Sequence, residues 1–261
     1  MKRFISISVV FFLLFFCSCG HTVKKKLQSF IGSYIEYNSL SSKQVGKQCV
    51  QLCFGGTSSV SQLIKDDQDR FETISKLNGD IGYNTSVNGN TGAGGLSLCT
   101  VFSPNIVSID VVTSRSFDAM HKENSSLGDI VRFMSFTLYP FISSGYTNIF
   151  SFKNSKSFSE PFSSYMAGYF TYFWPTSYPN FDYEKGVVPL HPVDGLLNSL
   201  RVQDLKMLVD IGRLKPQVDQ IVGYLYFERL PDLPGDYDIR IEITDENGKV
   251  YTSDITMSFD F

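Results

Sequence analysis

Residues 235–259 read GDYDIRIEITDENGKVYTSDITMSF, and this stretch predicts a β-hairpin. Apolar side chains alternate with polar ones in both halves of the stretch, as they do in strands that bury one face. The alternating apolar side chains occupy odd-numbered positions in both halves of the stretch. Side chains that lie directly opposite each other must share a face of the sheet, and apolar positions pair with one another only if the connecting loop contains an odd number of residues. We therefore expect a three-residue loop over 246–248, with Gly248 in the left-handed conformation.

This loop fixes which residues pair across the predicted hairpin. Ile239 is expected opposite Ile255 on one face, and Arg240 opposite Asp254 on the other. The stretch 233–249, LPGDYDIRIEITDENGK, resembles the Pro-Gly-x-Tyr strand and hairpin of immunoglobulin-like and transthyretin-like domains in envelope proteins. The resemblance implies a mainly β fold, an antiparallel immunoglobulin-like β-sandwich with short helical insertions.

The first twenty residues, MKRFISISVVFFLLFFCSCG, have the layout of an export signal. Two cations precede an apolar run that is too short to span a bilayer, and the small residue Ser18 precedes Cys19. The stretch resembles the signals of bacterial lipoproteins, which implies that Cys19 carries several acyl chains and anchors the chain stably. We expect residues 1–18 to be removed, 19–29 to form a polar lipidated tether, and 30–261 to form a single sandwich domain with helical and Gly-rich insertions. A cleaved secretory signal without lipidation is the alternative.

The lipoprotein resemblance also implies a location and a first partner. The location is the outer membrane, on its periplasmic face or at the cell surface, and the partner is the membrane itself. The chain, including TSRSFDAMHKENSSLGDIV at 113–131, is similar to a group of uncharacterised Bacteroidota lipoproteins, and this resemblance implies only a fold type and a location. From Cys19 onward, 21 Lys and Arg face 26 Asp and Glu, so the chain lacks the basic footprint of a nucleic-acid-binding protein.

The rest of the chain predicts more strands and a few helices. Alternating apolar residues indicate strands over 30–37, 49–54 and 96–112. Apolar residues at helical spacing indicate helices over 59–77, 126–134 and 200–209. Glycines and asparagines between the first helix and the next strand, over 78–95, predict turns.

Three cysteines remain downstream of the signal: Cys49, Cys53 and Cys99. On one strand, Cys49 and Cys53 would share a face but lie about 13 Å apart, too far for a disulfide between them. One of them could pair with Cys99, which would leave an odd thiol. The interpretation that fits better is three buried small apolar side chains with at most one disulfide.

The sequence carries no recognisable catalytic signature. It has no Gly-x-Ser-x-Gly elbow and no glycine-rich phosphate motif. Of its three histidines, His21 lies in the tether, His121 in a polar loop where exposure is expected, and His191 in the extended stretch 189–192. Such scattered histidines predict no metal site, and we expect no cofactor. A glycosidase needs two carboxylates at a set distance in three dimensions, which the sequence alone does not give. A hydrolase is therefore the less favoured interpretation, and we predict that the chain is not an enzyme.

Residues 165–183 are rich in aromatic side chains, with nine of them and two prolines. Flat rings on a rigid loop suit stacking on sugars or anchoring a protein, so Tyr172, Trp174 and Tyr178 are candidate ligand-binding residues. The alternative is that these rings cover the core, where large aromatics are common. We predict a non-catalytic envelope protein that binds a glycan or a protein. The alternative is a structural or assembly lipoprotein of an outer-membrane complex, whose sandwich edges receive a strand from another chain.

Overall fold

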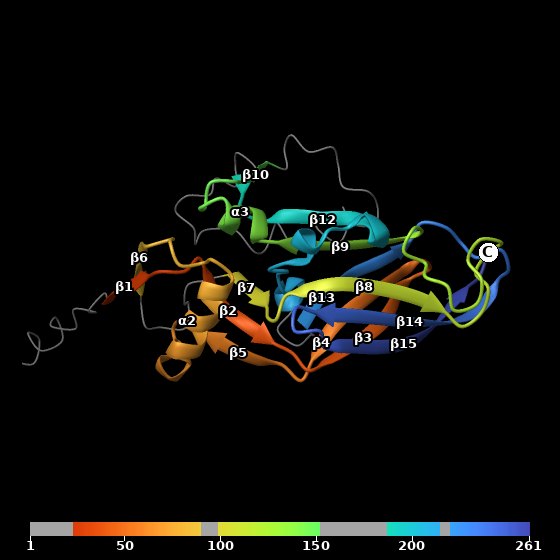
Figure 1. The fold of residues 1–261 in the computed structure, drawn as a ribbon, viewed down its shortest axis with the longest axis horizontal. Coiled ribbons are helices and arrows are strands. Elements are labelled where there is room, and N and C mark those ends of the chain that lie inside the picture. Colours follow the sequence, from red (N-terminus) through yellow and green to blue (C-terminus); the bar gives the residue numbers. More distant parts are fainter. Residues whose placement is uncertain (1–22, 90–98, 152–186, 215–219) are drawn as a thin grey trace, which may run out of the picture.

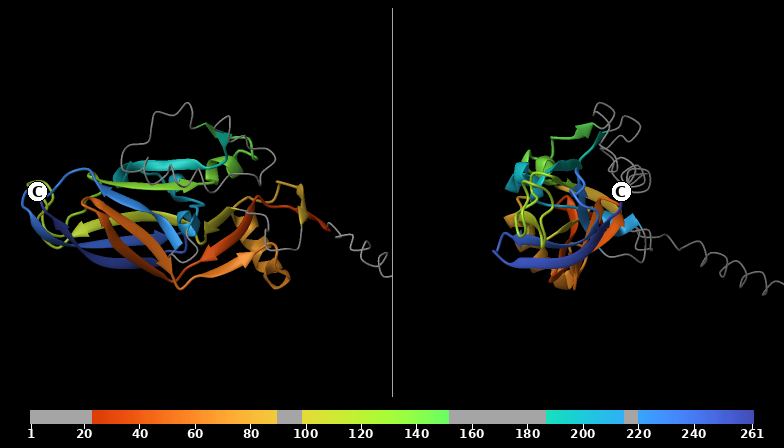
Figure 2. Two further views of the ribbon diagram at one scale, coloured as in Figure 1. Left: turned by 180° about the vertical axis from the view of Figure 1, so that it is seen from behind. Right: turned by 90° about the vertical axis from the view of Figure 1, so that its right-hand side faces the viewer.

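The computed structural model describes residues 23–89, 99–151, 187–214 and 220–261, and it confirms the predicted fold class. The chain is mainly β, its strand pairs are antiparallel apart from one, and its helices are short. Two sheets stack as a sandwich, and a third sheet extends from the sandwich toward the end that carries α2 (Figure 1). Two further views show that β1 and the C-terminus lie at opposite ends of the molecule (Figure 2).

The sandwich consists of a five-stranded sheet and a three-stranded sheet. The five-stranded sheet has the order β12 (His191–Leu196), β9 (Val131–Thr137), β13 (Gln220–Phe227), β4 (Cys49–Gly55) and β3 (Ser39–Gly46). The three-stranded sheet has the order β15 (Val250–Phe259), β14 (Gly235–Asp245) and β8 (Ile106–Thr113). Apart from the consecutive pair β3 and β4, neighbouring strands of the larger sheet come from distant parts of the chain.

The C-terminal hairpin has the predicted register. Ile239 pairs with Ile255 and Arg240 with Asp254. The amide of Asp245 donates to the carbonyl oxygen of Lys249 over 3.0 Å, which closes the loop over 246–248. Gly248 has a φ of 79°, the left-handed conformation that this loop requires. The local pattern of the sequence was therefore sufficient to predict this hairpin.

An aromatic cluster fills one end of the sandwich core. Phe117, Phe227, Tyr237 and Phe259 are at most 1% exposed, and their ring centroids lie 5.5 to 6.0 Å apart. Most of these contacts are edge-to-face, the arrangement that aromatic quadrupoles favour. The inner face of the hairpin is thus fastened to β13 of the opposite sheet.

Side chains close the sandwich where β3 meets β15. The Gln44 amide nitrogen donates to the Ser258 carbonyl oxygen (3.4 Å), and the Ser258 amide donates to Gln44 Oε1 (3.3 Å). The hydroxyl oxygens of Ser42 and Ser253 are 2.8 Å apart. The Gln44 side chain thereby satisfies the backbone amide and carbonyl of Ser258, with which a further strand would otherwise pair.

The third sheet is joined to the sandwich by a short extended segment. This sheet has the order β5 (Ser58–Ser61), β2 (Ile31–Glu36) and β7 (Cys99–Phe102), and β2 and β7 are parallel. The segment 207–209 forms backbone hydrogen bonds to both sheets. The amide of Phe102 in β7 donates to the Leu208 carbonyl oxygen (2.9 Å), and the amide of Val209 donates to the carbonyl oxygen of Phe136 in β9 (3.0 Å). We call 207–209 the bridge segment, because it connects β7 to β9.

Strand β4 is buried on both faces and separates two hydrophobic clusters. Leu52 and its neighbours of the same face belong to the sandwich core, whereas Cys49 and Cys53 belong to a second cluster under the third sheet. Cys99 lies in that second cluster as well, and all three cysteines are buried thiols. The interpretation of these residues as buried small side chains is therefore confirmed.

The helix predicted over 59–77 is only partly right. The α-helix α2 (Gln68–Leu77), preceded by the 3-10 turn η1 (Lys65–Asp67), buries Phe71 and Ile74. Before that turn, β5 pairs with β2, so the apolar residue Val60 belongs to a strand. The remaining helical elements are α3 (Tyr139–Ser143) and the 3-10 turns η2 (Leu197–Ser199), η3 (Val202–Leu205) and η4 (Ile211–Leu214). No helix in the described ranges has the length and apolar character needed to cross a bilayer.

Three further expectations differ from the structure. The helix predicted over 126–134 is wrong: after a turn the chain enters β9, which pairs with both β12 and β13. Over 200–209 the chain forms only the single turn η3 before the bridge segment. The tether expected through residue 29 is wrong from Val23 on, because β1 (Val23–Leu27) pairs with β6 (Thr85–Gly89) and Leu27 is 1% exposed. Strand β6 also lies inside the stretch 78–95 that we expected to form turns.

Candidate functional site

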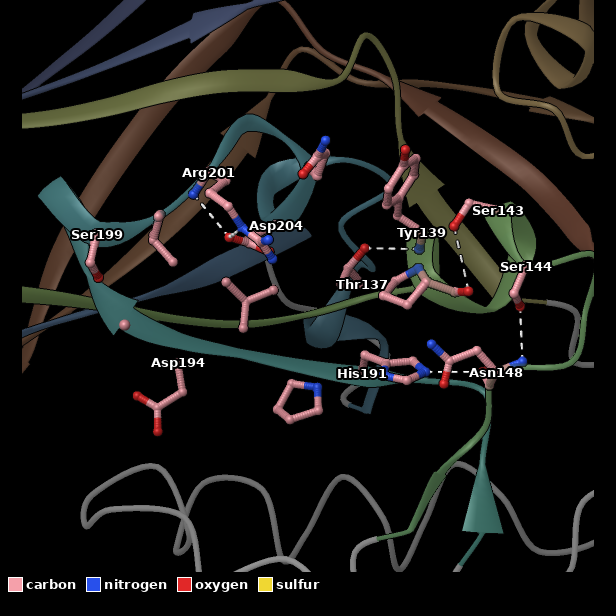
Figure 3. A pocket seen from close by; sticks show the side chains of 16 residues that line it. Thr137, Tyr139, Ser143, Ser144, Asn148, His191, Asp194, Ser199, Arg201 and Asp204 are labelled. Atoms are coloured by element: carbon pink, nitrogen blue, oxygen red, sulfur yellow. Dashed lines mark hydrogen bonds and ion pairs between the residues drawn. The ribbon is translucent and has the colours of Figure 1, made fainter.

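A cleft of about 770 Å³ runs along the edge strand β12. Its walls come from β12, from the end of β9, from α3 with Asn148, and from residues 199–204 around η2 and η3. Figure 3 shows the pair of Arg201 and Asp204 on one side of β12, Asp194 on the other, and His191 beside Asn148 at the far end. We call this feature the β12 cleft.

Backbone groups of β12 point into the cleft. The backbone amide of Val209, in the bridge segment, donates a hydrogen bond to the carbonyl oxygen of Phe136. The backbone amide and carbonyl of Phe136 therefore point away from β12. Its partner Pro192 is therefore in a non-hydrogen-bonded pair, and its carbonyl oxygen points away from β9, as do the amide and carbonyl of Asp194. Proline has no N–H, and its place on an edge strand weakens the edge as a template for another strand.

His191 and Asn148 form one end of the cleft. Nε2 of His191 lies 3.0 Å from the backbone carbonyl oxygen of Asn148, and its ring centroid is 5.8 Å from that of Phe150. Burial lowers the pKa of His191, so the ring is neutral at pH 7, donates through Nε2–H and keeps Nδ1 as an acceptor. The Ser144 hydroxyl oxygen accepts the amide of Asn148 (2.8 Å), which fixes this wall after α3.

Arg201 and Asp204 form the other end. The Arg201 amide donates to Oδ2 of Asp204 (2.9 Å), and its guanidinium donates to Oδ1 (2.9 Å) and Oδ2 (3.2 Å) of the same carboxylate. The hydrogen bonds from Arg201 hold the pKa of Asp204 below its usual value. The pair caps η3, and the side chain of Arg201, which ends in a planar charged group, is 73% exposed.

Arg132 holds Asp194 in the cleft wall from the neighbouring strand. NH1 of Arg132 lies 3.0 Å from Oδ1 of Asp194, and Nε lies 2.8 Å from Oε1 of Glu228. Both aspartates of the cleft therefore pair with an arginine. A general acid needs a carboxyl group with a raised pKa, whereas Arg201 lowers the pKa of Asp204.

The cleft is suited to a polar ligand. Hydroxyl, amide and charged side chains share its lining with proline, leucine and a tyrosine, and the edge of β12 adds backbone acceptors and donors. Its volume lies in the range of ligand sites, about 300–1,000 Å³. Within the ranges that the structure describes, no three His, Cys, Asp or Glu side chains gather as they would to hold a metal ion.

A second hollow of about 430 Å³ lies on the outer face of the three-stranded sheet. Its polar side chains bond mainly to one another: Arg240 Nε lies 3.0 Å from Asp254, and the Thr256 hydroxyl donates to Asp238 over 2.7 Å. These cross-strand pairs stabilise the hairpin and leave fewer groups for a ligand. The β12 cleft is therefore the better candidate site.

The expectation that His121 is exposed is wrong. His121 is 6% exposed, its Nδ1–H donates to Asp118 Oδ1 (2.8 Å), and its Nε2–H donates to Asp129 Oδ1 (2.7 Å). Burial disfavours the charge, but the two carboxylates outweigh burial and raise the pKa of His121. We call these three residues the His121 clamp; they fasten the loop after β8.

The predicted site residues lie outside the described residues. Cys19 precedes the first described residue, and Tyr172, Trp174 and Tyr178 fall between 151 and 187. The cleft was missed because its residues are spread from Thr137 to Asp204 and only the fold brings them together. His191 in its extended stretch was the one cleft residue noticed in the sequence. Comparisons of this chain with protein-family models, curated proteins and solved structures gave no match.

Proposed function

We propose that this chain is a lipid-anchored protein of the bacterial outer membrane that binds a glycan, without catalysis, in the β12 cleft. The observation that carries the proposal is the lining of the cleft, where hydroxyl, amide and paired charged groups outnumber apolar side chains. A sugar presents many hydroxyl groups, each both donor and acceptor, and fixed polar side chains match such a ligand.

The ion pairs support binding in preference to catalysis. Asp194 and Asp204 are held by Arg132 and Arg201, and Arg201 keeps the pKa of Asp204 below its usual value. Carboxylates that stay ionised accept hydrogen bonds from sugar hydroxyls, whereas a glycosidase also needs a protonated carboxyl group. His191 adds a neutral ring with one nitrogen available as an acceptor.

An oligosaccharide array probed with the purified protein tests the binding proposal. We expect the double variant Arg201→Ala, Gln203→Ala to bind any recognised glycan at least tenfold more weakly. Arg240→Ala is the matched control, because Arg240 is another exposed arginine in an ion pair with an aspartate, but outside the cleft. No binding to the array, or equal loss in both variants, contradicts the proposal.

The lipid anchor is tested separately. Metabolic labelling with palmitate is expected to mark the protein, and Cys19→Ser is expected to lose the label and to stay in the soluble fraction. Equal labelling of the parent and of Cys19→Ser contradicts acylation at this residue.

An assembly lipoprotein that receives a strand from another chain is the second candidate function. The position of β12 supports it, because among the described strands β12 is the last of the five-stranded sheet. Pro192 counts against it, because it removes a donor from that edge. Stoichiometric recovery of one envelope protein with the parent, kept in the cleft double variant, would favour this function over glycan binding.

The aromatic residues Tyr172, Trp174 and Tyr178 stay a prediction. Trp174 is the single tryptophan of the chain, so intrinsic fluorescence reports on it alone. An exposed binding ring gives red-shifted emission that acrylamide quenches. Blue-shifted emission that acrylamide does not quench contradicts the prediction.

A further inference from the structure

The segment 76–84, from the last two residues of α2 to the start of β6, displays an unusual set of side chains. Leu77 is 84% exposed and Ile81 is 52% exposed, and Lys76 is exposed beside them. The only carboxylate of the segment, Asp80, is 0% exposed. The surface of this segment therefore carries two large apolar side chains and a cation, and no acid. This contrasts with the acidic balance of the mature chain.

Hydrogen bonds hold this segment in place. The carboxylate of Asp80 accepts the amides of Phe30 (2.9 Å) and Ile31 (2.8 Å), at the start of β2. The amide of Gly82 donates to the Tyr146 hydroxyl oxygen over 3.0 Å, and the amide of Tyr83 donates to the Gln28 carbonyl oxygen over 2.9 Å. Leu77 and Ile81 are thus fixed beside the point where β1 leads into β2.

The length of the chain before β1 indicates what covers these side chains. Val23 lies four positions after Cys19 in the sequence, and an extended chain of that length spans at most roughly 14 Å. An acylated Cys19 would therefore hold β1 close to the bilayer. Strands β1 and β6 and the end of α2 lie at one end of the long axis, and the C-terminus lies at the other (Figure 1).

We propose that the segment 76–84 rests on the bilayer surface, with Leu77 and Ile81 in the interfacial region and Lys76 beside anionic headgroups. The proposal rests on the acylation of Cys19 put forward above. Apolar side chains gain from entering the interface, and a cation near the surface is attracted to anionic lipid. The molecule then stands on this end, and its C-terminal end projects away from the membrane.

Site-specific fluorescence on the acylated protein tests this orientation. The protein is reconstituted in vesicles of phosphatidylethanolamine and phosphatidylglycerol, with an environment-sensitive fluorophore on Leu77→Cys or Ile81→Cys. Leu233→Cys is the matched control, because Leu233 is a 61% exposed leucine near the C-terminal end. The natural thiols Cys49, Cys53 and Cys99 are buried, and burial raises the pKa of Cys49 to about 12, so labelling of the folded protein is selective.

Lipids brominated near the headgroup are expected to quench the label at 77 and 81 at least threefold more than the label at 233. Equal quenching at the three positions, in protein whose mass shows the acyl chains on Cys19, overturns the surface proposal and leaves the anchor intact. Protein without acyl chains overturns both proposals. Circular dichroism of each variant confirms that the label has not unfolded the protein.

Discussion

The hydroxyl of Tyr146 donates a 2.9 Å hydrogen bond to Oδ1 of Asp80, a carboxylate with no exposed surface. The same carboxylate accepts the amides of Phe30 and Ile31, so one side chain ties the end of α2 to β2 and to the chain after α3. Burial raises the pKa of Asp80 to about 6, although these hydrogen bonds favour its ionised form.

Asp80→Asn is expected to lower the free energy of unfolding by about 1–3 kcal/mol, because the amide group turns a donor toward backbone amides. The native pKa of Asp80 lies above its unfolded value of 3.8, so the native state binds more protons between these values. The stability from this group therefore grows as the pH falls from 7 through about 6. Urea unfolding should show a larger deficit of the variant at pH 5 than at pH 7. An equal deficit at both values contradicts the buried ionisation.

The His121 clamp should show the pH dependence of a histidine with a raised pKa. Its contribution to stability is complete below the unfolded pKa of 6.5 and is lost as the pH rises through the native value. The deficit of His121→Gln should therefore be larger at pH 6 than at pH 9. Burial lowers the pKa of His191, so the pH dependence of His191→Gln should have the opposite sign. Thermal unfolding across this range measures both, and dependence of the same sign in the two variants contradicts the assignment.

Gly223 allows the close approach of β13 to β9. A Cβ atom there would lie 2.4 Å from Phe133 Cε2 and 2.8 Å from the Met134 carbonyl oxygen. Gly223→Ala is expected to cost about 1–3 kcal/mol of unfolding free energy, because backbone cannot move aside cheaply. Gly46→Ala is the control, since its nearest neighbour, Cys49 Cβ, is at an ordinary 3.5 Å. Equal effects in urea unfolding would show that β9 and β13 are farther apart.

Gly248 is expected to matter through its backbone alone, because a Cβ atom there would meet nothing within 4 Å. Its left-handed conformation costs an alanine about 1–2 kcal/mol, whereas asparagine tolerates it better. Gly248→Ala should therefore unfold at a lower temperature than Gly248→Asn, and both should unfold below the parent. Calorimetry measures the order of the three melting temperatures, and equal values for the two variants contradict the loop conformation.

Local patterns predicted the C-terminal hairpin, of which one face is buried, but gave the wrong element for β9, which is buried on both faces. The hairpin alternates because only its inner face is buried, so even the pairing of Arg240 with Asp254 followed from spacing. In β9, Phe133, Met134 and Phe136 are all buried, and such a continuous apolar run also fits a helix. Val60 fitted the spacing of the following helix, but pairing with β2 placed it in a strand.

The candidate site was beyond the reach of local patterns for a related reason. Asp194 and Arg201 look like ordinary surface charges in the sequence, and the cleft between them exists only because β12 is the last strand of its sheet. The His121 clamp was missed because Asp118 and Asp129 become its partners only after the loop folds back.

The central position of β13 in the larger sheet sets the order in which the chain can fold. Strand β4 lies in the first quarter of the sequence, whereas its partner β13 begins at Gln220. During synthesis from the N-terminus, β4 and β9 cannot pair with β13, the strand between them, until more than four-fifths of the chain has been made. Pairing across such sequence distances is slow and leaves apolar edges open to aggregation. The strands β4 and β9 therefore lack their shared partner until β13 is available.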